Sequence, residues 1–324
     1  MKTRLSSIPL SWFIAGLVVC AAGTSAVSLM TDPSGRWDFG GGSFWYLLRL
    51  PRLVLGMVVG AQLAVSGLLL QTLFRNPLAE PYILGVSSGA SLGNVIWTLF
   101  LASVIELPFG MELSGALGGL LAVGLVVVVG RSLGMAGSPA FILVGVAVGA
   151  GLHALAALFL VQADPDKVRD ALVWLMGSLA LKSWSAVWTC LPVLVVSLIL
   201  VQLSSRALDL LSLGEEPSHY LGLDVGRLRM LVIVCAVLLA GSATASVGVV
   251  GFVGLMAPNV IRLSYSVSHR VMVPVSALTG AILVPLADLF ARWLAPGREI
   301  PIGILTSIAG SLFFILLLKK RGGV

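Results

Sequence analysis

Residues 204–229, SSRALDLLSLGEEPSHYLGLDVGRLR, form the longest polar interval in a chain that is otherwise nearly all apolar. Six hydrophobic segments precede this interval and four follow it. Inside it, Gly214 suits a helix N-cap, residues 215–217 (Glu-Glu-Pro) suit a first turn, and Gly222 suits a C-terminal stop. The sequence therefore predicts one short helix over residues 215–221.

A helix this short needs a surface to pack on. Helix nucleation is costly, and isolated helices shorter than about 12 residues are marginal in water. We therefore interpret residues 204–229, called the handle below, as a docking element for a protein outside the membrane. An ordinary connecting loop is the alternative that the pattern alone leaves open.

The composition of the chain places it in a membrane. The sequence is 58% hydrophobic and 10% charged, and its mean hydropathy is +1.06, whereas ordinary soluble domains carry roughly 25% charged residues. The 37 glycines suit close approach of helices in lipid. We expect an all-α polytopic membrane protein with one transmembrane domain, residues 1–324, and no soluble domain.

The basic residues and the cysteines do not indicate a nucleic acid partner, a disulfide or a metal site. The isoelectric point is near 9.6, but the longest basic run is Lys319-Lys320-Arg321 and the other cations flank apolar segments, so we expect no nucleic acid partner. Cys20, Cys190 and Cys235 lie inside apolar segments without CxxC spacing. They are predicted to be core residues rather than disulfide partners or metal ligands.

Ten apolar stretches approach the roughly 20 residues that a bilayer core requires. They cover residues 10–30, 53–74, 83–104, 113–130, 140–162, 184–203, 230–249, 251–267, 271–295 and 302–318. The eighth is the weakest, because it is short and contains Pro258, Asn259 and Arg262. The first resembles a signal peptide, but a retained helix is favoured because the rest of the chain is apolar too.

Charge asymmetry predicts the orientation. An even number of spans puts both termini on one side, and 12 of the 20 lysines and arginines fall on that side. The positive-inside rule then makes both termini and the handle cytoplasmic. On the other side, residues 171–181 are predicted to form a short helix that does not span.

Ionisable groups inside the predicted spans are scarce. They are Arg262, Asp288 and Arg292, of which the last two are spaced i, i+4 and predict a local ion pair. An ion-coupled carrier normally needs carboxylates or broken-helix cation sites within the membrane. An enzyme needs a nucleophile, base or metal cluster, and no such motif or GxxxxGK[ST] phosphate loop is present. We therefore predict no catalytic, metal or cofactor site, and active transport would need energy from another subunit.

Several ordered motifs resemble the FecCD family. They are RLPR at residues 49–52, FRNPLAEPYILGVSSGA at 74–90, LGEEPSHYLGLDVGRLR in the handle, GVVGFVGLMAPNVIR at 248–262, LADLFAR at 286–292 and EIPIGILTSIAGSLFFILLLKK at 299–320. This family comprises permease subunits of ABC importers for iron-siderophores, haem and cobalamin. The resemblance implies a type II importer permease of ten helices in the bacterial inner membrane, which forms a homodimer.

The resemblance also implies partners and residue roles. Two ATP-binding ABC subunits would dock on the handle, and an external solute-binding protein would deliver the cargo. The functional positions of the family map to three groups of residues in this sequence. The group that docks the binding protein is Arg49, Arg52 and Arg292, and the cytoplasmic gate is Asn76, Leu78, Gly137 and Ser138. The group that couples to the ATPases is Leu213, Glu215, Tyr220, Leu221 and Leu223.

The expected function is therefore ATP-driven import of an iron(III)-siderophore. Haem and cobalamin remain open as cargo, because no residue separates them. An ion-coupled secondary transporter is the alternative from another class.

Overall fold

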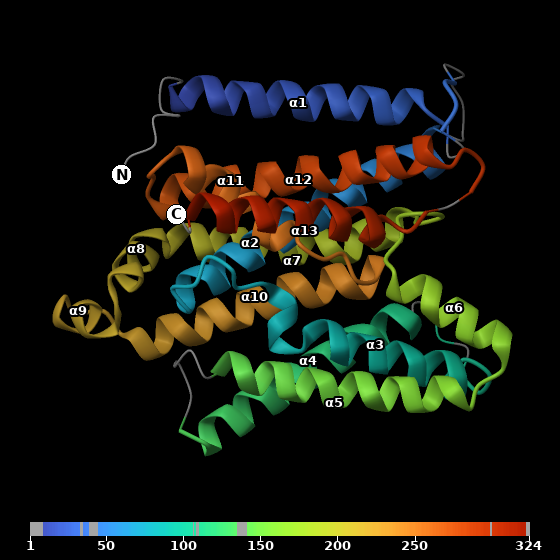
Figure 1. The fold of residues 1–324 in the computed structure, drawn as a ribbon, viewed down its shortest axis with the longest axis horizontal. Coiled ribbons are helices and arrows are strands. Elements are labelled where there is room, and N and C mark those ends of the chain that lie inside the picture. The colour runs from blue at the N-terminus through green and yellow to red at the C-terminus, as the bar shows by residue number, and fades with distance from the viewer. Residues whose placement is uncertain are drawn as a thin grey trace.

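The computed structural model describes residues 9–32, 35–38, 45–105, 107, 110–134, 141–298 and 300–321. These residues are almost entirely helical (Figure 1). Within them, β-pairing is limited to one antiparallel bridge between Thr31 and Trp37. The predicted all-α class is confirmed.

Eight helices in the described part of the chain are long and apolar enough to cross a membrane. They are α1 (Leu10–Met30), α2 (Leu50–Leu73, preceded by the π-helical turn η1, Trp45–Arg49), α4 (Gly110–Ser132), α5 (Phe141–Val161), α7 (Trp184–Leu203), α10 (Val225–Val247), α12 (His269–Leu294) and α13 (Ile302–Arg321). The shorter elements are η2 (Pro81–Leu84), α3 (Val86–Ile96), η3 (Trp97–Leu101), α6 (Pro165–Leu175), α8 (Ser205–Leu213), α9 (Glu215–Tyr220) and α11 (Val253–Ser264).

The predicted count of ten spans is not confirmed. The third predicted span is divided among η2, α3 and η3, and the eighth is represented by α11, which has 12 residues. Backbone turns explain both short elements. Gly85 has φ +77° before α3, and Phe252 has φ +67° before α11, so each helix begins later than its apolar stretch does.

The helix predicted over residues 171–181 is misplaced. The structure forms α6 over Pro165–Leu175, and Gly177 has φ +73°. Pro165 suits the first helical position, and the charged residues that follow form an exposed face of α6 rather than a turn. The left-handed glycine then ends the segment, because such a backbone cannot continue a right-handed helix.

Helix α2 is the centre of the fold, and 89% of its most apolar window is buried (Figure 1). Glycines let two neighbours approach it closely. A Cβ at Gly60 would lie 2.0 Å from the carbonyl oxygen of Gly280 in α12, and one at Gly67 would lie 2.1 Å from that of Gly254 in α11. Both contacts are backbone against backbone, which is how small residues hold helices together in lipid.

The cysteine prediction is correct in part. All three cysteines are free, and Cys190 and Cys235 are buried. Cys20 is exposed on α1, so the expectation of a core position is wrong there. Helix α1 has few buried residues, and an apolar side chain on its outer face is compatible with lipid.

Candidate functional site

The handle folds as two short helices, α8 and α9, at the end of the molecule where α1 begins and α13 ends (Figure 1). Gly214 joins them as the N-cap of α9 with φ +123°, and Gly222 follows α9 with φ +81°. The Ser218 hydroxyl donates to the carbonyl of Leu210 at 2.8 Å and fastens α9 to α8. The predicted helix is confirmed and ends one residue earlier than expected.

Apolar side chains project from this handle. Leu213, Tyr220 and Leu221 are 62%, 88% and 61% exposed. Leu223 is half-buried and packs against the core. The backbone of Glu215 begins α9, but its side chain is not among the described parts of the structure. A cluster of exposed apolar groups on a polar segment is typical of a surface that another protein covers.

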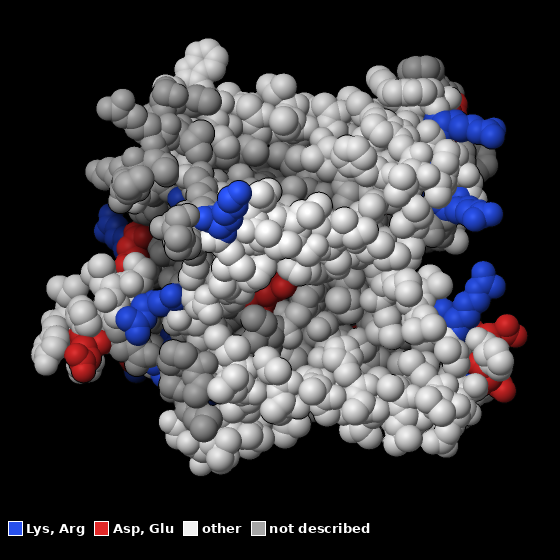
Figure 2. Space-filling view, viewed as in Figure 1, with Lys and Arg blue, Asp and Glu red and all other residues white. Residues whose placement is uncertain are grey.

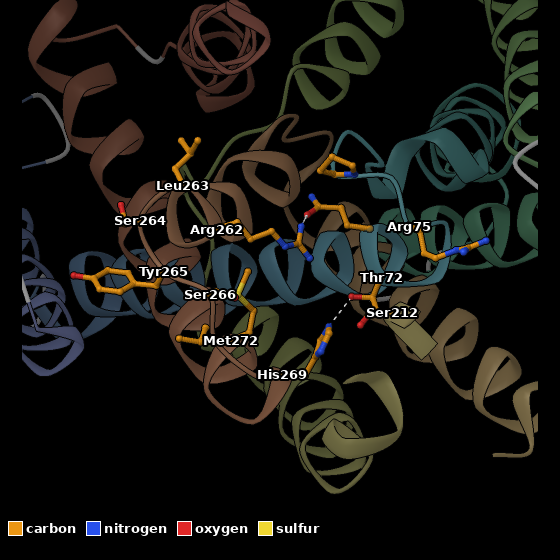
Figure 3. Close-up of a pocket in the computed structure, with 13 residues that line it drawn as sticks. Thr72, Arg75, Ser212, Arg262, Leu263, Ser264, Tyr265, Ser266, His269 and Met272 are labelled. Atoms are coloured by element: carbon orange, nitrogen blue, oxygen red, sulfur yellow. Dashed lines mark hydrogen bonds between the residues drawn. The ribbon is translucent and has the colours of Figure 1, made fainter. Parts of the chain in front are cut away.

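A pocket of about 700 Å³ lies at the base of the handle (Figure 3). Its wall includes Ser212 of α8, Thr72 of α2 and His269 of α12. Arg262 of α11 points across the pocket toward α2, where its guanidinium donates to the side-chain oxygen of Gln71. The pocket therefore lies between α8 of the handle and the neighbouring ends of α2, α11 and α12.

A short chain of polar contacts crosses beside this pocket. The Asp209 carboxylate of α8 accepts from the backbone N–H of His269 at 2.9 Å and lies 2.6 Å from its Nδ1. The Nε2 of the same ring lies 2.8 Å from the Thr72 hydroxyl of α2. Asp209, His269 and Thr72 therefore link the handle to α12 and to the central helix.

The turn after α2 contains the residues predicted for a gate. The Asn76 side-chain oxygen accepts from the backbone N–H of Leu78 at 2.9 Å, which fixes a tight Asx turn. Both residues are half-buried. Gly137 and Ser138, the other predicted gate residues, lie outside the described residues.

This turn is bound to the segment between α10 and α11. The Tyr82 hydroxyl donates to the carbonyl of Val250 and accepts from its N–H, both at 2.9 Å. The Glu80 carboxylate accepts from the backbone N–H of Phe252, and Asn259 donates to the carbonyl of Pro77 at 2.7 Å. Two glycine- and proline-rich motifs far apart in sequence therefore form one hydrogen-bonded junction.

Burial of Glu80 makes this junction sensitive to pH. Burial raises the pKa of the Glu80 carboxyl from 4.5 to about 7, although the N–H donated by Phe252 opposes the shift. The folded chain thus holds this proton more tightly than the unfolded chain does. The stability that Glu80 contributes is complete below pH 4.5 and is lost as the pH rises through 7.

We predict that Glu80→Gln removes this pH dependence. The amide can still accept from Phe252, so the variant should match the parent at pH 5 and be more stable at pH 8, by on the order of 1–3 kcal/mol. Thermal unfolding of the purified protein at the two pH values measures the difference. Glu216→Gln, at an exposed site on the handle, is the control. A parent-like pH profile for the Glu80 variant would contradict the prediction.

Arg49, from the predicted docking group, lies at the opposite end of α2 from the handle. Its Nη1 donates to the backbone carbonyls of Leu29 and Asp38 at 3.0 and 2.9 Å, and its Nη2 pairs with the Asp38 carboxylate. The guanidinium is therefore buried against the turn that follows α1.

Arg52 and Arg292 share one carboxylate. Arg52 binds Asp288 in a bidentate manner, through Nε at 3.0 Å and Nη2 at 2.7 Å. Arg292 places its Nε 3.3 Å from the same carboxylate, which confirms the predicted local pair, and its Nη2 donates to the Ser28 hydroxyl at 2.7 Å. We call Arg49, Arg52, Arg292, Asp38 and Asp288 the outer cluster. It joins the far ends of α2 and α12 to the turn after α1.

Charges on the drawn face agree with a membrane slab. In Figure 2, most of the coloured side chains gather toward the two ends of the long axis, and the band between them is mostly white. The handle and the outer cluster therefore lie at opposite ends of an apolar body. No group of three or more His, Cys, Asp and Glu that could hold a metal ion occurs among the described residues.

Comparison with known proteins decides the family. The model of the FecCD transport family matches residues 10–320. The chain belongs to the FecCD transport family. FecCD proteins are permease subunits of ABC transporters, so this chain is a multi-pass membrane transport subunit and not an enzyme, and it works with ATPase and substrate-binding partners.

Relatives within the FecCD family differ in cargo. The cobalamin import permease BtuC of Halobacterium salinarum is 41% identical, over 85% of this chain and 73% of its own length. The hemin permease HmuU of Yersinia pestis is 37% identical, over 86% of this chain and 84% of its own length. The Fe(3+) dicitrate permease FecD of Escherichia coli is 38% identical, over 90% of each chain.

The fold agrees with a solved transporter. A structure described as an inward-facing conformation of a metal-chelate type ABC transporter has a TM-score of 0.85 and 31% identity to this chain. The match covers 96% of this chain and 99% of the chain in that structure. The type II importer permease fold expected from the motifs is thereby confirmed.

Proposed function

We propose that this chain imports an iron chelate across a bacterial inner membrane, as one of two identical permease subunits. Both termini and the handle are cytoplasmic in this proposal, and a solute-binding protein delivers the cargo at the outer cluster. The observation that carries the proposal is the handle, whose exposed Leu213, Tyr220 and Leu221 suit an apolar groove in each of two ATPase subunits.

Arg49, Arg52 and Arg292 are proposed to receive carboxylates of the binding protein. Asn76 and Leu78 are proposed to gate the cytoplasmic mouth, together with Gly137 and Ser138. Leu213, Glu215, Tyr220, Leu221 and Leu223 are proposed to transmit movement from the ATPases. In support, the first group lies at one end of the molecule, and the handle and Asn76 lie toward the other.

The proposed mechanism is a shift between outward- and inward-open states. ATP binding closes the two ATPase subunits and moves both handles. The contacts of Asp209 with His269 and of His269 with Thr72 would carry that movement to α12 and α2. Nucleotide can shift the equilibrium only by its differential affinity for the two states.

An iron chelate is the proposed cargo. Support comes from relatives named for ferric dicitrate and for iron(3+)-hydroxamate, which are 38% and 37% identical to this chain. Cobalamin is the second candidate, because a relative named for it is 41% identical. Haem is the third, on the relative named for hemin.

Reconstitution tests this function. The permease with its ATPase subunits in liposomes, supplied with a solute-binding protein and labelled ferric siderophore, should accumulate iron on addition of ATP. The permease alone should accumulate none, because its sequence has no GxxxxGK[ST] phosphate loop to bind ATP. Cobalamin and haem in place of the siderophore decide the cargo. Uptake by the permease alone, driven by a proton or sodium gradient, would instead establish an ion-coupled carrier.

A further inference from the structure

Two carboxylates form ion pairs with the three guanidinium groups of the outer cluster. Arg49 pairs with Asp38, Arg52 and Arg292 share Asp288, and Asp32 places a third carboxylate near Arg292. The Nε of Arg49 is buried and has no hydrogen-bond acceptor, whereas the Nε of Arg292 lies 3.3 Å from the Asp288 carboxylate. A buried donor without an acceptor is costly, so Arg49 can take a further oxygen acceptor at its Nε.

The two acids of the cluster differ in exposure. The side chain of Asp288 is 3% exposed, and it is enclosed between Arg52 and Arg292. The side chain of Asp38 is 47% exposed and lies on the turn after α1. A carboxylate arriving from outside would therefore meet Asp38 first. The Asp38 carboxylate is half-exposed, so water can solvate it when another carboxylate takes its place beside the buried guanidinium of Arg49.

We propose that Asp38 is an internal plug that occupies, in the free permease, the place on Arg49 that a carboxylate of the solute-binding protein takes on docking. This inference rests on the proposed function, because it needs an external partner at the outer cluster. The incoming carboxylate displaces Asp38 from Nη2 and can also accept from the unsatisfied Nε. Docking is therefore a competition between two acids for one arginine.

The proposal predicts a gain of affinity from the loss of a charge. In Asp38→Asn, the plug is neutral and binds the guanidinium more weakly, and the repulsion between Asp38 and the partner's acid is gone. The solute-binding protein of the same transport system should dock about three- to tenfold tighter at low salt. The gain should shrink at 0.5 M salt, because screening weakens both terms.

The experiment uses the full permease–ATPase complex in nanodiscs and the purified solute-binding protein loaded with ferric siderophore. Docking affinity is measured for the parent, Asp38→Asn and Asp38→Glu, and the glutamate variant should behave like the parent. Asp224→Asn is the matched control, since Asp224 is also about half exposed and pairs with an arginine, Arg227, on the handle. In an Arg49→Gln background, Asp38→Asn should bring a smaller gain, because only the relief of repulsion with the partner's acid remains.

Each outcome is decisive. Unchanged thermal unfolding of Asp38→Asn together with tighter docking supports the plug. Equal or weaker docking of that variant, with normal ATP-driven uptake, overturns the plug and leaves the proposed function standing. Failure of the binding protein to dock on any variant or to stimulate ATP hydrolysis counts against the proposed function, and the plug falls with it.

Discussion

Replacing Leu221 by aspartate should abolish ATP-driven uptake while the permease still folds. Leu221 is exposed at the tip of the handle, and few contacts within the chain depend on it. Burying a leucine side chain in a partner's groove contributes about 1.5–3 kcal/mol. A carboxylate at the same position adds a desolvation cost of several kcal/mol. The two effects together should weaken ATPase docking by a hundredfold or more.

Co-purification of the ATPase subunits with tagged permease measures this loss directly, and uptake in liposomes measures its consequence. Leu181→Asp is the matched control. Leu181 is 84% exposed in the segment between α6 and α7, at the other end of the molecule, and its φ of +54° is one that aspartate tolerates. The control should keep its ATPases. If Leu221→Asp also keeps them, the handle is an ordinary connecting loop.

The parts of this fold that the sequence predicts well are those governed by local chemistry. The first and sixth predicted spans match α1 and α7 residue for residue, because long apolar runs end at polar residues. The handle helix follows from Gly214 and Gly222, whose positive φ angles set its two ends. The pair of Asp288 with Arg292 follows from their spacing of four on a helix.

What the sequence does not predict depends on contacts between distant segments. The sequence gives no functional interpretation for Glu80 and Tyr82. Their partners, Phe252 and Val250, are about 170 positions away. Both partners are bound through backbone atoms, which carry no residue-specific signal. The link from Asp209 to His269 is hidden too, because the two side chains are 60 positions apart in the sequence. A hint was present in the two glycine- and proline-rich motifs, one in each half of the chain.

The outer cluster shows the same limit of prediction from sequence. The family motifs identify Arg49, Arg52 and Arg292 as a set, but only the fold brings Asp288 between two of them and Asp38 onto the third. Their docking role remains a prediction. The structure adds that these arginines are already paired inside the chain, so any docking partner must compete with internal acids.

Asp288→Ala should destabilise the permease more than any surface substitution. The change leaves Arg52 and Arg292 side by side without the buried carboxylate that both contact. Removing one member of a buried ion pair costs about 3–5 kcal/mol, because the remaining charge stays in a medium of low polarity.

A control separates lost charge from lost packing. Thermal unfolding in detergent should show a large fall in melting temperature for Asp288→Ala and little change for Asp224→Asn, which keeps the N-cap oxygen of α10 and removes only an exposed charge pair with Arg227. Replacing Arg52 and Arg292 by methionine and Asp288 by leucine together should recover most of the stability, since apolar groups of similar size can substitute for buried charges. That triple variant should fold but fail to dock the binding protein. A melting temperature for Asp288→Ala equal to that of the parent would mean that water already screens the cluster.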